Sequence, residues 1–138
     1  MGCGKGVVLR AASYYPFEKI AGIEIDDRLV IIAEKNFRIL KMTDRIQCIH
    51  ADAVGFEGYG DYNVFFLANP FSDIIMSEVA DKLIKVAEKN PVIIIYHNPV
   101  YMNIFEQRGE VTILKKLYDK RKDYNTYIFR WVKAGNIG

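Results

Sequence analysis

The sequence has few cysteines and no long apolar run. Only Cys3 and Cys48 occur in 138 residues, without the CxxC spacing of a zinc site, so we expect two free thiols in a reducing compartment rather than a disulfide scaffold. The longest apolar runs span about five residues, whereas a membrane helix needs roughly 20, and the N-terminus lacks the apolar core of a signal peptide. These absences predict a cytoplasmic protein with no structural metal site and no membrane partner.

Repeats and Ser-, Gly- or Pro-rich stretches are also absent, which argues against a disordered chain or a repeat array. Hydrophobic residues make up 51% of the chain, enough for one sizeable core. We therefore predict a single domain over residues 1–138.

Positive charge is concentrated at the C-terminal end. Residues 1–107 hold 11 Lys and Arg against 14 Asp and Glu, whereas residues 108–138 hold 8 against 3. Such a basic segment suits an acidic substrate such as RNA, but lysines also protect exposed strand edges from aggregation, and that interpretation is the more common one.

Apolar periodicity predicts alternating helices and strands. Strands are expected at 20–25, 46–51, 64–68 and 92–96. Helices are expected at 5–14, after a cap at Asp26 or Asp27, from Ser72 or Asp73 to about 89, and at 100–107. A terminal antiparallel hairpin is expected from 111–118 and 125–131. The runs 64–68 and 92–96 lack polar alternation, which is typical of parallel strands covered on both faces, and we expect the first of them to be central. The order indicates an α/β fold, a doubly wound and mostly parallel sheet.

Ligands of such sheets bind beyond the carboxyl ends of the strands, so the residues there are the candidate site. The segment Gly2-Cys3-Gly4-Lys5-Gly6 opens the first helix, and its glycines allow sharp turns and a close backbone approach to a ligand. It is not a P-loop, because Gly6 stands where Ser or Thr is needed. An incidental turn is the alternative.

Acidic residues follow the next two strands. Glu24 interrupts an apolar strand, where a carboxylate can accept both hydroxyls of a ribose; a structural role would require its own hydrogen-bond donor. Asp52 follows the strand 46–51 and can accept a hydrogen bond from an exocyclic amine, although Asp52 alone would be a turn residue.

Asn69, Pro70 and Phe71 follow the strand 64–68. An Asn side chain can hold an amine, and an aromatic ring can lie against the acceptor group, although Asn-Pro also ends strands in unrelated folds. His97, before a second Asn-Pro, is a candidate base, but a lone His is more often structural.

Together these motifs resemble the class I S-adenosylmethionine-dependent methyltransferases, whose pattern is acid-x-Gly-x-Gly-x-Gly followed by acids after the second and third strands. The resemblance implies a Rossmann-like fold whose last strand inserts antiparallel beside the fifth, and S-adenosylmethionine as the cofactor. It implies that the methionine part lies on Gly2, Gly4 and Gly6, the ribose on Glu24, adenine on Ile25, Asp52 and Ala53, and the methyl acceptor on Asn69, Pro70 and Phe71.

The sequence departs from the family pattern at two places, and each departure leads to a further expectation. The first acid would fall one position before Met1 and the family's central first strand has no counterpart, so we expect an upstream segment, or a second copy of the chain, to complete the sheet. Asn69-Pro70-Phe71 has one proline fewer than the Asn-Pro-Pro-aromatic motif of amino-group methyltransferases. A nitrogen acceptor is therefore favoured only weakly, and the acceptor could be a small molecule, a protein or RNA.

Two other functions fit parts of the sequence. A nicotinamide-dependent oxidoreductase also uses Gly-x-Gly and an acid, but its third glycine would be required where Val7 stands. A non-catalytic RNA-binding or assembly module would explain the basic, tyrosine-containing C-terminal hairpin.

Overall fold

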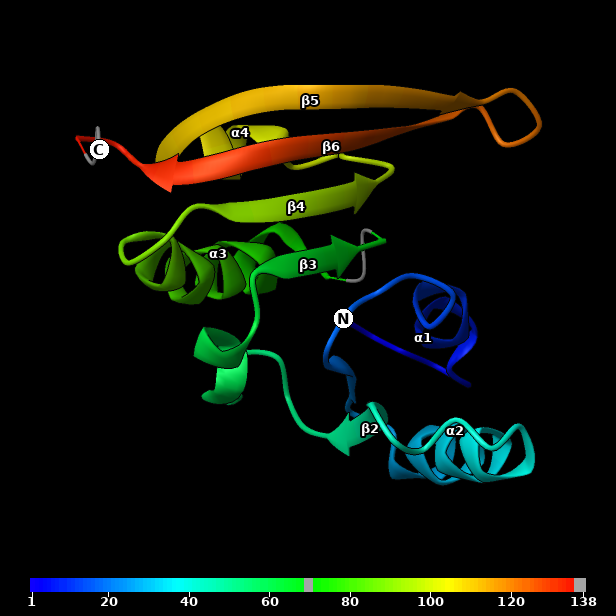
Figure 1. Ribbon diagram of the computed structural model, residues 1–138. Helices are drawn as coiled ribbons and strands as arrows, with labels where there is room; N and C mark the ends of the chain where they lie inside the picture. The colour runs from blue at the N-terminus through cyan, green and yellow to red at the C-terminus, as the bar shows by residue number, and fades with distance from the viewer. Residues whose placement is uncertain (69–70, 136–138) are drawn as a thin grey trace. The chain divides into compact units, whose positions relative to one another are not determined.

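The computed structural model describes residues 1–68 and 71–135, which divide into two compact units, Met1–Phe56 and Glu57–Gly138. The elements of the N-terminal unit are α1 (Val7–Ala12), β1 (Ile20–Glu24), α2 (Asp27–Ile39) and β2 (Ile46–His50) (Figure 1). Those of the C-terminal unit are a 3₁₀ helix (Gly58–Asp61), β3 (Val64–Leu67), α3 (Asp73–Ala87), β4 (Val92–His97), α4 (Met102–Glu106), β5 (Gly109–Asp119) and β6 (Tyr124–Lys133).

In the N-terminal unit, β1 and β2 pair in parallel with Gly22 opposite Cys48. A small apolar core joins the two strands to the two helices; it consists of Leu9, Ile20, Ala33, Phe37, Ile46 and Cys48. The helix α2 begins where expected because the Asp26 side chain accepts the N–H of Arg28, satisfying one of the free donors of the first turn. The Arg28 guanidinium hydrogen-bonds Asp26 in return and holds the pKa of that carboxyl below its usual range.

The sheet of the C-terminal unit has the order β3-β4-β6-β5. The strands β3 and β4 are parallel, and β6 is antiparallel to both β4 and β5. The predicted hairpin is therefore confirmed, with its last strand inserted beside β4 as the family resemblance implied. The strand β3 lies at one edge of this four-stranded sheet rather than at its centre.

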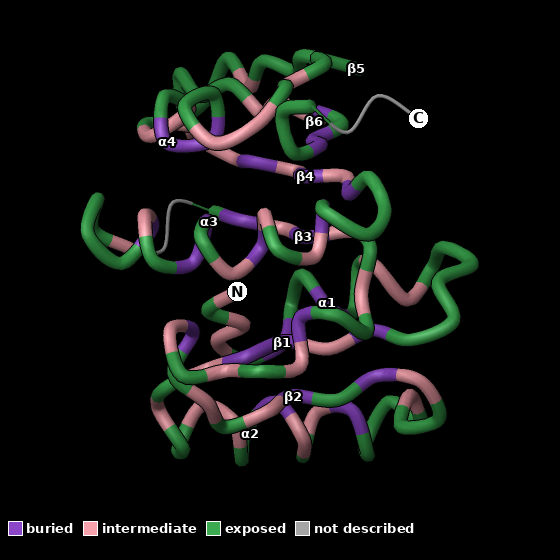
Figure 2. The backbone as a smooth tube through the Cα atoms, turned by 90° about the vertical axis from the view of Figure 1, so that its left-hand side faces the viewer, coloured by how far each residue is buried: buried purple, intermediate pink, exposed green. Residues whose placement is uncertain are grey.

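The expectation that the apolar strands are covered on both faces is wrong for β3 and β4. Along both strands, buried residues alternate with residues of intermediate exposure (Figure 2). The buried ones are Phe65 and Leu67 in β3, and Val92, Ile94 and Tyr96 in β4. On the buried face, Phe105 of α4 packs edge-to-face against Tyr96, Phe129 and Trp131. Because Val64, Phe66, Ile93 and Ile95 on the other face are apolar as well, the predicted runs carry no alternation that would have revealed the difference.

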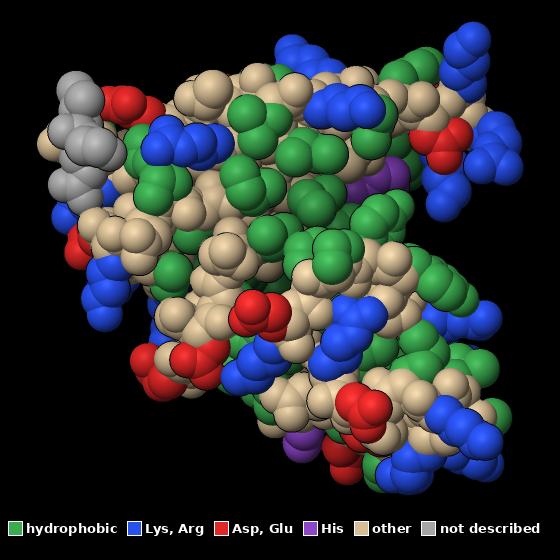
Figure 3. Space-filling view, viewed as in Figure 1, with side chains coloured by type: hydrophobic (Ala, Val, Ile, Leu, Met, Phe, Trp, Pro, Cys, Tyr) green, Lys and Arg blue, Asp and Glu red, His purple; other side chains and the backbone are tan. Residues whose placement is uncertain are grey.

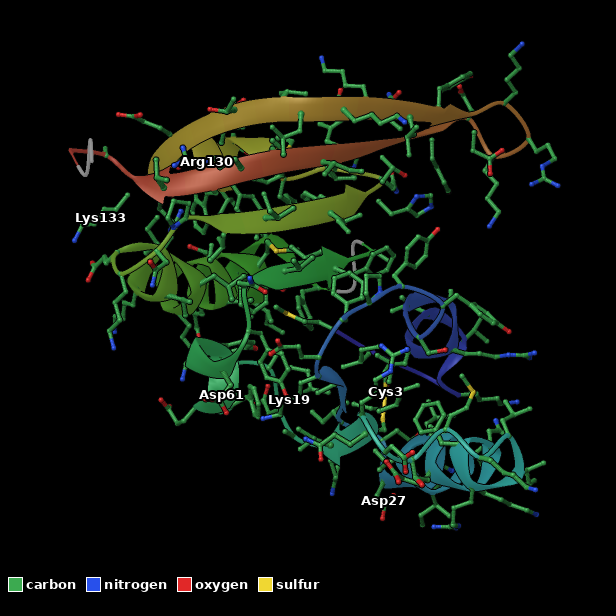
Figure 4. All side chains as sticks on the ribbon, in the orientation of Figure 1. Cys3, Lys19, Asp27, Asp61, Arg130 and Lys133 are labelled. Atoms are coloured by element: carbon green, nitrogen blue, oxygen red, sulfur yellow. A yellow bond between two sulfur atoms is a disulfide. The ribbon has the colours of Figure 1, made fainter. Side chains whose placement is uncertain are left out.

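The prediction of two free thiols is also wrong, because the structure pairs Cys3 with Cys48 in a disulfide (Figure 4). The pairing of β1 with β2 sets Cys48 opposite Gly22, and the side chain of Cys3 fills the space that a Cβ at Gly22 would occupy. The Cα atoms are 7.1 Å apart, just beyond the usual span of a disulfide.

Within residues 1–68 and 71–135, no helix is long and apolar enough to cross a membrane. The same residues contain no group of three or more His, Cys, Asp or Glu arranged to hold a metal ion.

Candidate cofactor site

The glycine loop has the backbone geometry that its sequence predicts. Gly2, Gly4 and Gly6 all have positive φ angles, of 66°, 52° and 91°, in the left-handed region that other residues rarely adopt. The N–H groups of Gly2 and Cys3 both donate to the carbonyl of Ile23, at 2.9 and 3.1 Å, near the carboxyl end of β1. The loop therefore lies against the edge at which the candidate ligand site was expected.

Glu24 joins this loop to the start of α2. Its Oε2 accepts the N–H of Gly4 at 2.9 Å and its Oε1 accepts the N–H of Asp26 at 3.1 Å. These donors satisfy the charge that would otherwise be costly in a strand, so the structural role considered for Glu24 does exist. An ionised carboxylate has about four acceptor positions, so each oxygen still has capacity for a ligand hydroxyl.

The carboxyl end of β2 lies beside that of β1. The N–H of Ala51 donates to the Glu24 carbonyl at 3.1 Å, and Nε2 of His50 lies 3.0 Å from the Ile25 carbonyl. The side chain of Ile25 is 68% exposed, whereas Ala53 is buried. The structure thus brings the glycine loop, Glu24 and Ile25 together with the segment that follows β2.

Asp52 is exposed, and its Oδ1 accepts the N–H of Val54 at 3.1 Å, the arrangement of a turn-forming aspartate. The carbonyl of Asp52 accepts the N–H of Phe56 at 2.9 Å. The expected turn role is therefore present, and the acceptor capacity of an exposed carboxylate exceeds this one bond.

Gly4 and Gly6 have different surroundings. A Cβ at Gly6 would come within 2.6 Å of the Phe37 ring, so that position allows the loop to pack on α2. A Cβ at Gly4 would meet nothing within 4 Å. Gly4 therefore borders open space, and its N–H is the group that donates to Glu24.

The acceptor motif is only partly described. Asn69 and Pro70 lie outside the described residues, and Phe71 is half-buried just before Ser72, which caps α3 through the N–H of Ile75. The roles predicted for these three residues stay predictions.

His97 has a fixed orientation that the sequence did not reveal. Its Nδ1 lies 2.8 Å from the hydroxyl of Thr126 on β6, and its ring meets that of Tyr124 edge-on at 5.7 Å. The antiparallel register sets His97 opposite Thr126, so the contact of His97 with Thr126 and Tyr124 exists only because distant strands pair. In the sequence, the predicted hairpin was the signal that such a pairing would form.

No family model matches the chain. It is 31% identical over 75 residues to the rRNA N(6)-adenosine-methyltransferase metl-5 of Caenorhabditis elegans, a match that covers 51% of this chain and 35% of that protein. The chain therefore spans about a third of that relative's length.

Solved structures resemble the whole chain. An RNA methyltransferase from Salinibacter ruber in complex with S-adenosyl-L-homocysteine is 20% identical, with a TM-score of 0.68 over 99% of this chain and 80% of that one. The N-methyltransferase NodS from Bradyrhizobium japonicum, in complex with the same compound, is 12% identical, with a TM-score of 0.69 over 96% and 75%. The chain has the Rossmann-like fold of the class I S-adenosylmethionine-dependent methyltransferases.

Proposed function

We propose that the protein is an S-adenosylmethionine-dependent methyltransferase that modifies a nitrogen atom in RNA. The assignment as an S-adenosylmethionine-dependent methyltransferase rests on the glycine loop. This loop has three left-handed glycines and one N–H bonded to Glu24, and it borders open space at the carboxyl ends of two parallel strands. That is the edge at which doubly wound sheets bind ligands.

The residues of the N-terminal unit fit this cofactor in chemistry. Glu24 retains acceptor capacity for the two ribose hydroxyls, and the exposed side chain of Ile25 offers an apolar surface to adenine. Asp52 and the neighbouring Ala53 would contact the adenine edge, and Gly2, Gly4 and Gly6 would line the methionine part. When bound, the cofactor supplies a methyl group on a sulfonium sulfur, and the protein's task is to align the acceptor and exclude water.

A nitrogen acceptor is supported by Asn69, Pro70 and Phe71, where an Asn side chain would orient the amine and the ring would lie against the acceptor. RNA is supported by the printed activity of the C. elegans relative and by the basic C-terminal segment. His97, whose Nδ1 lies 2.8 Å from the Thr126 hydroxyl, would be the candidate base for the proton that a methylated amine releases.

Replacing Asn69 by Ala tests the acceptor role. Methyl transfer from labelled S-adenosylmethionine to ribosomal RNA should fall by at least tenfold, while affinity for S-adenosylhomocysteine, measured by calorimetry, stays within about twofold of the unmodified protein. Equal losses in both would contradict that role, and label found in protein rather than in RNA would contradict the RNA acceptor.

A further inference from the structure

The hairpin of β5 and β6 ends in a turn of three consecutive basic residues. Lys120, Arg121 and Lys122 are all exposed, and the side chain of Arg121 is 91% exposed although its Nε lies 3.7 Å from Asp119. Figure 3 shows Lys and Arg side chains projecting around the free end of this hairpin. Part of the positive charge of residues 108–138 thus lies together at the free end of this hairpin.

The acidic residues of the turn are engaged within the hairpin. Asp119 accepts the N–H of Arg121 at 2.9 Å, and Asp123 accepts the hydroxyl of Tyr118. In the described part of the chain, neither Lys120 nor Lys122 is paired with an acid. These two ammonium groups are therefore available to an external anion.

Protection of a strand edge does not account for the turn. Lys115 and Lys116 lie within the edge strand β5, where lysines commonly block pairing with another chain. The last paired residues of the hairpin are Asp119 and Tyr124, so residues 120–122 lie beyond the edge and have no exposed strand to protect. Protection of the edge strand therefore does not explain their charge.

Two tyrosines flank the turn. Tyr118 is 55% exposed and Tyr124 is 41% exposed, and because they occupy neighbouring rows of the hairpin they lie on opposite faces. Basic side chains that contact phosphates, combined with exposed aromatic rings that stack on unpaired bases, are the chemistry by which proteins bind single-stranded nucleic acid. Duplex RNA would not offer its bases to these rings.

The turn also lies at the appropriate edge of its sheet. Thr126 is opposite His97, the last residue of β4, so residues 120–123 extend beyond the carboxyl end of β4 (Figure 1). We propose that this turn binds single-stranded RNA, with Lys120, Arg121 and Lys122 on the phosphates and Tyr118 stacked on a base. The inference rests on the RNA acceptor of the proposed function and adds the surface that recognises it.

The test is the binding of a fluorescein-labelled 20-nucleotide single-stranded RNA, followed by fluorescence anisotropy between 50 and 200 mM salt. The K120A/R121A/K122A variant should bind at least tenfold more weakly at 50 mM salt. The slope of log affinity against log salt should become shallower by about 2, since each phosphate contact on a single strand contributes about 0.7.

A matched control removes the same charge elsewhere. The K35A/R38A/K89A variant also loses two exposed lysines and one exposed arginine, and its RNA affinity should stay within about twofold of the unmodified protein. For the ring, Y118F should retain affinity whereas Y118L should lose about fivefold or more. Unfolding followed by circular dichroism verifies that each variant is folded.

Equal losses in the two triple variants would overturn the inference, because net charge alone would then explain binding. Unchanged affinity in the turn variant, no binding by the unmodified protein at 50 mM salt, or equal competition by polyglutamate would also overturn it. Calorimetry with S-adenosylhomocysteine on the same samples separates the two hypotheses: turn-dependent RNA binding without cofactor affinity supports this inference and contradicts the proposed enzyme.

Discussion

The Oε2 atom of Glu24 accepts the backbone N–H of Gly4 at 2.9 Å, so the carboxylate expected to bind the ribose also holds the glycine loop in place. Its second oxygen accepts the N–H of Asp26 at the start of α2. One side chain thus couples the loop, the end of β1 and the following helix, and its loss should affect the ligand site and its support together.

Replacing Glu24 by Gln should weaken the binding of S-adenosylhomocysteine by about 10- to 100-fold. The amide keeps one acceptor oxygen but directs an NH₂ group at a backbone donor, and hydrogen bonds to a charged group contribute about 1.5–3 kcal/mol. Calorimetry measures the change. The control is Asp27→Asn, which neutralises an exposed carboxylate three residues away and should leave the affinity unchanged. Unchanged affinity in Glu24→Gln would show that Glu24 does not bind the ligand.

Replacing Gly6 by Ala should destabilise the protein by about 2–4 kcal/mol, because the new Cβ meets the Phe37 ring and a non-glycine residue is strained at φ 91°. Urea unfolding measures the loss. Gly60→Ala is the matched control, since a Cβ there meets nothing within 4 Å.

The double variant Gly6→Ala with Phe37→Leu separates the two causes. If the clash contributes, Gly6→Ala should cost less stability in the Phe37→Leu background than in the unmodified protein, while the strain of the positive φ remains. The Phe37→Leu single variant is the reference, because the smaller side chain alone leaves a gap in the core. A Gly6→Ala protein as stable as Gly60→Ala would show that the loop geometry is wrong.

Replacing Asp26 by Ala should lower the melting temperature at pH 7, because the cap of α2 and its pairing with Arg28 are lost. The pKa of Asp26 is depressed in the folded state, so its stabilising effect is present above the unfolded value of about 3.9 and is lost as pH falls through the lower folded value. The difference in melting temperature between the two proteins should therefore shrink below about pH 4. A difference independent of pH would indicate that the carboxylate charge contributes nothing.

Reducing the Cys3–Cys48 disulfide should lower the free energy of unfolding by about 2–4 kcal/mol, since the bridge closes a loop between residues 45 positions apart. Urea unfolding with and without a phosphine reductant measures this. The Cys3→Ala variant should be insensitive to the reductant. Two reactive thiols per unfolded chain in the absence of reductant would restore the original expectation of free cysteines.

Much of the N-terminal unit was predictable because its signals are local. The glycine spacing predicted the turn that all three positive φ angles realise, and an acid inside an apolar strand required donors, which the structure supplies from Gly4 and Asp26. The helix α1 begins at Val7 rather than at Lys5 because Gly6 is still in the left-handed region.

Features that depend on strand pairing were not predictable. The contact of His97 with Thr126 and the disulfide both arise from registers that join distant segments. The half-buried state of β3 was hidden because Val64 and Phe66, on its less buried face, are as apolar as Phe65 and Leu67. Periodicity reports which residues are apolar, not how many layers cover them.

We propose that the loop, Glu24 and the end of β2 form a site for S-adenosylmethionine rather than for a dinucleotide. Parallel calorimetric titrations of the protein with S-adenosylhomocysteine and with NAD distinguish the two ligands. We expect one-to-one binding of S-adenosylhomocysteine, weakened in Glu24→Gln, and no measurable heat with NAD. Binding of NAD without binding of S-adenosylhomocysteine would rule out the S-adenosylmethionine site.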